Sequence, residues 1–332
     1  MTRTIAFAMI LAAALVGSVW TVSGQQTPRA AAKQEGGLPA GPQSKVTKQQ
    51  FDEWVAKLSN WGRWGKDDER GTLNLITTEK SRQAATLAKT GTAVSLSRQI
   101  PRQKPTSTAQ PRPVSQAGAF TSHFLIGGDY LFERQEIEYH GGLLSHFDAL
   151  CHVSYNGKLY NGLNFKDVVT NEGGCTKLTV NSAQNGIITR GILLDIPSTR
   201  VTPSDIAAWE KKTGLRISSG DVLLLRTHRP GTPAPGFSAA GYEPSLIPLL
   251  KERDVALIGS DTAQEGGTIP GVGIPIHVFT IVALGMNLLD NLALDDLAAT
   301  AEKLKRWEFM LVVEPLRVQN GAGSAVNPVA VF

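Results

Sequence analysis

The sequence predicts one mixed α/β domain behind an N-terminal leader. Three apolar, β-branched runs indicate buried strands, and segments of helical periodicity separate them. Several connections between these elements are short loops, which favours a mixed sheet over a strictly parallel, doubly wound one. Of the 332 residues, 42% are hydrophobic and 19% are charged, as in a folded globular protein. No internal repeat or strong linker follows Ser44, so a single domain over 45–332 is the simplest organisation.

The leader, residues 1–24, has the pattern of a secretory signal peptide. Arg3 provides the positive start, an apolar run covers 5–16, and small residues at 22–24 suit cleavage. The alternative is an uncleaved membrane anchor, but the apolar run is short for a membrane span. We therefore expect export to the periplasm or beyond. Residues 25–44, rich in Gln, Ala, Pro and Gly, are expected to form a disordered linker.

Helices are expected where apolar residues recur at helical spacing behind a capping residue. The expected helices cover 45–58 with Thr47 as N-cap, 78–88, 202–213, 244–251, 277–284 and 294–307. Strands are expected where β-branched and apolar residues form short runs bounded by turn residues. The expected strands cover 93–97, 122–126, 136–139, 187–195, 220–227, 255–259 and 310–314. A long surface loop is expected over 99–118, which is rich in Pro, Arg and Gln.

The charge pattern gives no sign of a nucleic-acid-binding protein. The net charge is +4, and lysines and arginines are scattered without a long basic run. The chain has two cysteines, Cys151 and Cys175. In an exported protein they could form a disulfide, although Cys151 could equally be a small buried apolar residue. So few cysteines exclude a scaffold built on disulfides.

The chemistry concentrates between residues 140 and 162, which contain three of the six histidines. His146, Asp148 and His152 stand at even offsets, so an extended strand would place them on one face, with Phe147 opposite in the core. Two imidazoles and a carboxylate suit zinc, manganese or iron. Alternatively, the histidines are buried core residues with hydrogen-bond partners, and Asp148 caps a turn. The spacing alone leaves both interpretations open.

Further candidate ligands occur later in the chain. Asp261 follows the apolar strand VALIG, His277 follows a Gly/Pro-rich loop, and Asp290 lies in GMNLLDNL. The ends of strands often hold functional residues. Alternatively, Asp261 forms an Asx-turn and Asp290 caps a helix or turn.

The segment SHFDALCH at 145–152, followed by NGKLYNG, resembles the signature of the cyclase family of metal-dependent hydrolases, which includes bacterial kynurenine formamidase. The family pattern is His-x-Gly-Thr-His-x-Asp-x-Pro-x-His, and here Ser145 replaces the Thr and Leu150 the Pro. GSDT at 259–262, His277 and Asp290-Asn291-Leu292 match the later family pattern in order. The resemblance extends from about Trp61 to the C-terminus.

The resemblance implies a swivelling β/β/α fold, Zn²⁺ or Mn²⁺ as cofactor, and His146, Asp148, His277 and Asp290 as ligands. His152 would be the catalytic proton donor and acceptor. Two positions depart from the pattern. The family's first metal-binding His falls on Gly142, where nearby His140 could substitute, and its late Glu is Asp290. One ion and two ions therefore both remain open. We also expect a homo-oligomer, either dimer or tetramer.

The implied activity is hydrolysis of a C–N bond in a small N-formyl or N-acyl aromatic amide or a cyclic amide, as in tryptophan catabolism. A lactonase or dehydratase-type cyclase and an inactive binding protein are the alternatives. Trp64, Arg226 and His228 are candidates for binding the substrate. Arg226 and His228 could hold a carboxylate, or Arg226 could form a structural ion pair. The tryptophans Trp61 and Trp64 could pack on the core edge or line an aromatic pocket.

Overall fold

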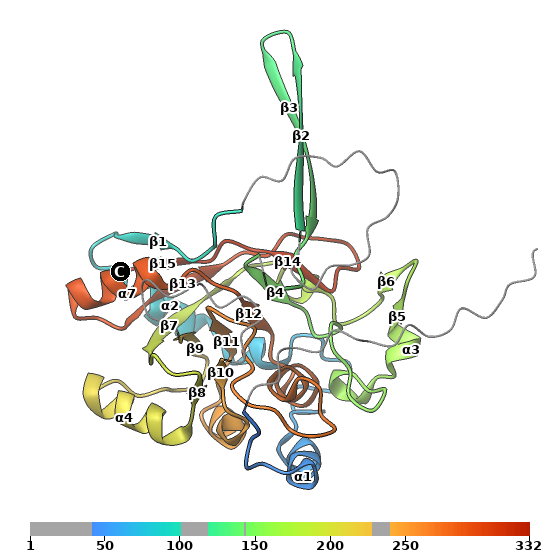
Figure 1. Ribbon diagram of the computed structural model, residues 1–332, viewed down its shortest axis with the longest axis vertical. Coiled ribbons are helices and arrows are strands. Elements are labelled where there is room, and N and C mark those ends of the chain that lie inside the picture. The colour runs from blue at the N-terminus through green and yellow to red at the C-terminus, as the bar shows by residue number, and fades with distance from the viewer. Residues whose placement is uncertain (1–41, 101–118, 143, 228–239) are drawn as a thin grey trace, which may run out of the picture. The chain divides into compact units, whose positions relative to one another are not determined.

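The computed structural model describes residues 42–100, 119–142, 144–227 and 240–332 (Figure 1). The expected signal peptide at 1–24, most of the expected loop at 99–118, and His228 lie outside the described residues. So does the expected linker, except for its last three residues. Those three residues belong to the folded part, because Ser44 is buried and its N–H donates to the Thr268 carbonyl at 2.8 Å.

A nine-stranded sheet forms the centre of the domain, in the order β1-β15-β13-β7-β9-β11-β12-β4-β14. Its strands are β1 (Ala93–Ser95), β4 (His146–Asp148), β7 (Ile187–Asp195), β9 (Val222–Arg226), β11 (Leu257–Ser260), β12 (Leu288–Asp290), β13 (Glu308–Val313), β14 (Gly323–Ala325) and β15 (Val329–Val331). The four inner strands β7, β9, β11 and β12 run parallel, and all other neighbouring pairs are antiparallel. This mixed sheet confirms the predicted fold class.

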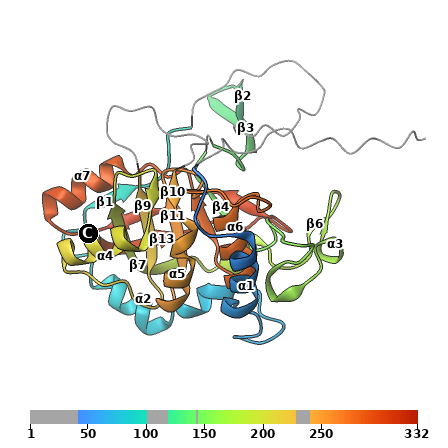
Figure 2. The same cartoon turned by 60° about the horizontal axis from the view of Figure 1, so that its bottom comes forward.

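Helices flank the sheet (Figure 2). The α-helices are α1 (Lys48–Leu58), α2 (Thr78–Ala85), α3 (Phe165–Val168), α4 (Pro203–Thr213), α5 (Ile247–Glu252), α6 (Pro275–His277) and α7 (Asp295–Leu304). Tighter turns form η1 (Gly71–Leu75), η2 (Tyr160–Gly162), η3 (Val180–Ala183) and η4 (Pro244–Leu246), and η5 (Val278–Leu284) is a π-helix. No helix in the described ranges has the length and apolar character needed to cross a membrane.

Local sequence explains several of these elements. Every residue of β9, VLLLR, is buried, as expected for an inner strand covered on both faces. A capping box between Thr202 and Asp205 starts α4, and Gly214 ends it in the left-handed conformation. Thr47 caps α1 through the Gln50 N–H, as predicted.

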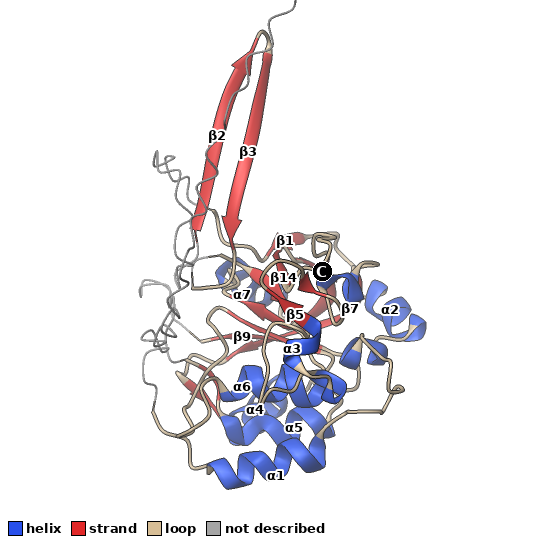
Figure 3. Ribbon diagram, turned by 90° about the vertical axis from the view of Figure 1, so that its right-hand side faces the viewer, coloured by secondary structure: helices blue, strands red, loops and turns tan. Residues whose placement is uncertain are grey.

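Three smaller two-stranded sheets complete the described structure. They pair β2 (Ala119–Gly127) with β3 (Tyr130–Glu138), β5 (Val169–Thr170) with β6 (Gly174–Cys175), and β8 (Arg200–Val201) with β10 (Gly241–Tyr242). The first corrects the prediction of two short strands, because β2 and β3 form a long hairpin (Figure 3). β14 and β15 were not predicted from the sequence. Their three-residue length gives too little alternation to recognise.

Candidate metal centre

Strand register brings the first three candidate ligands together. In the antiparallel pair β4–β12, Asp290 lies opposite His146, and Leu288 lies opposite Asp148. Directly paired residues of neighbouring strands share one face of the sheet. His146, Asp148 and Asp290 therefore face the same side. All three are nearly fully buried.

His152 reaches the same region by a turn and not along a strand. The prediction of one extended face through residue 152 is therefore wrong. β4 ends at Asp148, and the His152 N–H donates to the Ala149 carbonyl at 3.0 Å. Cys151 within this turn forms a disulfide with Cys175, with Cα atoms 6.4 Å apart. The disulfide thus ties the turn that carries His152 to strand β6.

His277 arrives from α6, far along the chain, and Glu265 holds it in place. One Glu265 oxygen accepts from the His277 N–H at 3.0 Å and lies 2.8 Å from Nδ1. A carboxylate accepts, so Nδ1 donates to Glu265, and Nε2 is the ring nitrogen left to face the other carboxylates. That Nε2 lies 3.3 Å from Asp290 Oδ2 and 3.7 Å from Asp148 Oδ2.

His146 is oriented in the same way. Its Nδ1 lies 2.8 Å from the Leu144 carbonyl, which can only accept, so Nδ1 donates. The Nε2 lone pair then faces Asp148 Oδ1 at 3.5 Å and Asp290 Oδ2 at 4.0 Å. Metal-binding histidines are commonly fixed by such an acceptor on the second ring nitrogen. Both His146 and His277 have this arrangement.

His140 also enters the cluster, as the loop before β4 bends towards the sheet. Its Nδ1 lies 3.1 Å from Asp148 Oδ1. Its ring stacks on that of His152, with centroids 3.9 Å apart and planes within 4°. Gly323 of β14 leaves room for this ring, because an added Cβ would lie 3.2 Å from His140 and only 2.4 Å from the Phe147 carbonyl.

The ionisable groups perturb one another strongly. Burial alone would raise the pKa of Asp148, but the imidazoles of His152 and His146 lower it below its usual value. Burial lowers the pKa of His152 to about 4, although the charge of Asp148 opposes this shift. Burial would also lower the pKa of His277, whereas the carboxylates of Asp290 and Glu265 raise it well above the usual value. Such mutual perturbation is typical of functional sites.

The donor set fits a divalent cation. Asp148 is 1% exposed, yet neither of its oxygens receives a well-aligned hydrogen bond from any described residue. A buried carboxylate without donors is costly unless a cation satisfies it. His146, Asp148 and Asp290 present ligand atoms within 4.8 Å of one another, and the His277 Nε2 faces the same two carboxylates. Imidazole nitrogens with carboxylate oxygens are ligands that zinc and manganese accept.

A second group, His140, Asp148 and His152, also has ligand atoms within 4.8 Å. However, a nitrogen lone pair lies in the plane of its ring. The parallel stacking of His140 on His152 therefore keeps their lone pairs from converging on one point. The geometry favours one ion position between His146 and His277 and leaves His152 beside it.

Two of the three predicted substrate-binding residues, Arg226 and Trp64, do not join this cluster. Arg226 donates to Asp195 at 2.8 Å and to Asp295 at 2.9 Å, so the structure favours its role in an ion pair over a role in carboxylate binding. The Arg63 guanidinium lies over the Trp64 ring, with its Cζ atom 4.8 Å from the ring centroid. His228 lies outside the described residues.

The sequence patterns described above assign no role to Glu265 or Gln264. The structure gives both a definite contact. Glu265 fixes His277, and the Gln264 side-chain amide donates to Asp290 Oδ1 at 2.9 Å. Neither residue belongs to the motif around residue 146. The available signal was their place directly after the GSDT segment.

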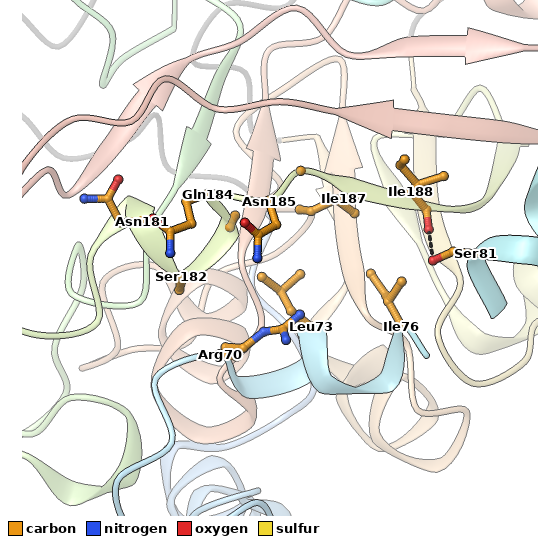
Figure 4. A pocket seen from close by; sticks show the side chains of 12 residues that line it. Arg70, Leu73, Ile76, Ser81, Asn181, Ser182, Gln184, Asn185, Ile187 and Ile188 are labelled. Atoms are coloured by element: carbon orange, nitrogen blue, oxygen red, sulfur yellow. Dashed lines mark hydrogen bonds between the residues drawn. The ribbon is translucent and has the colours of Figure 1, made fainter. Parts of the chain in front are cut away.

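A separate cavity of about 390 Å³ lies between η1, α2 and the start of β7 (Figure 4). Amides and hydroxyls line one part of it, whereas Leu73 and Ile76 line another; the Ser81 hydroxyl at its edge donates to the Ile188 carbonyl at 2.6 Å. None of the lining residues belongs to the metal-ligand cluster. This cavity therefore contributes no residue to the cluster of His146, Asp148, His277 and Asp290.

Comparison with known proteins gives a consistent result. Residues 94–265 match the family described as "Putative cyclase". A crystal structure of a novel cyclase is similar over 84% of this chain and 99% of that chain, with 25% identity and a TM-score of 0.71. An isatin hydrolase bound to the product analogue thioisatinate shares 20% identity over 77% of this chain and 99% of that one, with a TM-score of 0.50. A search of curated proteins finds no match.

Proposed function

This chain belongs to the cyclase family, and we propose that it is a metal-dependent hydrolase that cleaves the C–N bond of a small cyclic amide or an N-acyl or N-formyl aromatic amide. One observation carries the proposal. His146 and His277 are 131 positions apart in sequence (277 − 146). The Nε2 atom of each lies within 4.0 Å of the same two buried carboxylates, those of Asp148 and Asp290.

We assign His146, Asp148, His277 and Asp290 as the ligands of a Zn²⁺ or Mn²⁺ ion. When bound, such an ion lowers the pKa of water from about 15.7 towards 7 and stabilises a developing oxyanion. Two carboxylates balance its charge, and Glu265 and the Leu144 carbonyl keep both imidazoles in the ligating tautomer.

His152 is the proton carrier in this proposal. Its pKa of about 4 keeps the imidazole neutral at neutral pH, so it can accept the proton released by the attacking water and return it to the leaving nitrogen. Stacking on His140 fixes the plane of its ring. Positioned proton transfer typically contributes 10²–10⁴-fold in rate.

Family likeness supports the amide class. The structural relative that binds thioisatinate is an isatin hydrolase, which makes isatin-type lactams the first compounds to test here. A lactonase or dehydratase-type cyclase would use the same ion and the same His152. Export is a further part of the proposal, and the Cys151–Cys175 disulfide supports an oxidising compartment.

The test compares His152→Ala with His146→Ala in purified protein. Metal content is measured by elemental analysis, and turnover is measured on isatin, N-formylkynurenine and an aromatic lactone. We expect His152→Ala to keep its metal and lose about 10²–10⁴-fold in turnover. His146→Ala should lose both. As a control, Asp67→Asn changes a carboxylate whose side chain is 76% exposed and should leave both unchanged.

Three outcomes would contradict parts of this proposal. Full turnover in His152→Ala would remove its catalytic role. Turnover of the lactone alone would replace the amidase with a lactonase. Metal-loaded wild-type protein that binds these compounds and turns over none of them would make it an inactive binding protein.

A further inference from the structure

The cavity between η1, α2 and the start of β7 lies at the other end of the parallel strands from the metal cluster. Ile187, the first residue of β7, lines it. The register through β11 and β9 aligns Leu289, the residue before Asp290, with Leu193 of β7. Ile187 precedes Leu193 by six residues (193 − 187), which is roughly 20 Å at about 3.3 Å per residue. The cavity is therefore a place of its own and no extension of the metal cluster.

The wall of this cavity, here called the Arg70 cavity, carries one charge. Arg70 is the only ionisable side chain among its lining residues. The two acids directly before Arg70 are engaged by backbone groups. Asp68 accepts from the N–H of Gly71 at 2.8 Å, and Glu69 accepts from the N–H of Leu178 at the same distance. Among the described residues no carboxylate forms an ion pair with Arg70, so its positive charge is uncompensated.

A neighbouring cavity shows the opposite arrangement. It measures about 280 Å³, and Lys80 and Arg190 are among its lining residues. Asp221 lies 2.5 Å from the Lys80 ammonium and 2.6 Å from the Arg190 guanidinium. Glu308 pairs with Arg190 at 3.0 Å. Two cations and two carboxylates balance there, so an anion entering that cavity would meet no unmatched charge, whereas the Arg70 cavity offers one.

The rest of the Arg70 cavity divides into a polar part and an apolar part (Figure 4). The polar part includes the Asn185 amide and the Ser182 hydroxyl, which has no hydrogen-bond partner among the described residues. Amides and hydroxyls can donate to an anion. Leu73 and Ile76 form the apolar part, on the same wall as Arg70. A molecule that fits both parts has one anionic end and an apolar body.

We propose that the Arg70 cavity is a second small-molecule site, which binds a small carboxylate with an apolar body. A guanidinium holds a carboxylate by two parallel hydrogen bonds. One cation balances one carboxylate, whereas a phosphate dianion would stay half compensated. The cavity volume of about 390 Å³ lies in the range of roughly 300–1,000 Å³ that is typical of small-molecule sites. The proposal does not depend on the amide hydrolysis proposed above, so either can fail alone.

The experiment measures binding of benzoate to the purified full chain by isothermal titration calorimetry. Benzyl alcohol, which keeps the ring without the charge, and inorganic phosphate are titrated alongside. The test variant is Arg70→Gln. The control, Arg82→Gln, removes an arginine that is 77% exposed and does not line the cavity. We expect the dissociation constant of benzoate to rise at least about tenfold in the test variant and to stay unchanged in the control.

A further variant, His146→Ala, separates the Arg70 cavity from the metal cluster. Benzoate can also bind to a metal ion, and this variant removes a proposed metal ligand. Because the two places are roughly 20 Å apart along the strands, His146→Ala should bind benzoate as tightly as wild type. Circular dichroism checks that each variant is folded. Should Arg70→Gln unfold, Asn185→Asp replaces it, because a carboxylate on the cavity wall would compensate Arg70 and weaken benzoate binding to the same extent.

Several results would overturn the proposal. One is the absence of benzoate binding to wild type below about 10 mM. Others are equal benzoate affinity in wild type and Arg70→Gln, or equal affinity of wild type for benzoate and benzyl alcohol. Tighter binding of phosphate than of benzoate would replace the carboxylate with another anion. Loss of benzoate binding in folded His146→Ala would move the site to the metal cluster.

Discussion

The cluster of His146, Asp148, His277 and Asp290 differs from the β2–β3 hairpin in how its side chains are held in position. In the cluster, Asp148 and His277 are buried and held by neighbours from several strands and loops. In the hairpin, β2 and β3 pair only with each other among the described strands, and Leu131 is 63% exposed. The two regions are joined directly, because β3 ends at Glu138 and His140 belongs to the cluster.

This difference shows which side chains have their positions set by contacts within the fold. The side chains of the cluster are held by contacts within the fold, so a single change there should have large consequences. The hairpin depends on its own register and on whatever covers it. Changes at its exposed end should therefore have little effect on the stability of the chain.

The largest effect is expected from Asp148→Asn. This change keeps the side-chain shape but removes the buried charge that faces His146 and His277. Metal content should be lost, and turnover should fall by about 10³-fold, or about 4 kcal/mol in activation free energy. Elemental analysis and steady-state kinetics measure both. Retention of metal and rate would show that the cluster does not hold the catalytic ion.

A smaller loss is expected on breaking the disulfide that ties the His152 turn. Cys151 and Cys175 are 24 positions apart in sequence, and their disulfide closes the loop between them. Replacing both with Ser should lower the free energy of unfolding by about 3 kcal/mol, as measured by denaturant unfolding. Wild type in reductant is the matched control and should show the same loss. An unchanged midpoint in both would mean that the turn does not need the covalent link.

Glu265→Gln should weaken metal binding without removing a ligand. The amide keeps the shape but holds the His277 Nδ1–H less strongly than the carboxylate does. Metal affinity, measured by competition with a chelator, should fall about 10–100-fold. Glu308→Gln, which alters a carboxylate paired with Arg190, is the control. Equal affinities for both variants would deny Glu265 its orienting role.

The smallest effect is expected in the hairpin. Leu131→Ser should change the free energy of unfolding by less than about 0.5 kcal/mol, because the side chain is exposed. Chemical denaturation provides the measurement. A loss of several kcal/mol would place the hairpin against the rest of its own chain and would remove the contrast between the two regions.

Much of the fold could be predicted from local sequence. The strand Ile187–Asp195 and the helix ending at Gly214 were predicted within a residue, because apolar runs and capping residues act locally. The prediction for residues 146–152 failed beyond Asp148, because the turn at Ala149 depends on a main-chain hydrogen bond and on the disulfide at Cys151. These contacts leave no periodic trace in the sequence.

For the site, the sequence by itself determined which side chains are available: the motif around His146 and the later His277 and Asp290. It also determined membership of one family. Only the tertiary structure decided which groups meet. Strand register places Asp290 beside His146, and Glu265 turns the His277 ring inward. The physical reason is that residue type sets what an atom can donate or accept, whereas convergence requires contacts between segments more than a hundred residues apart.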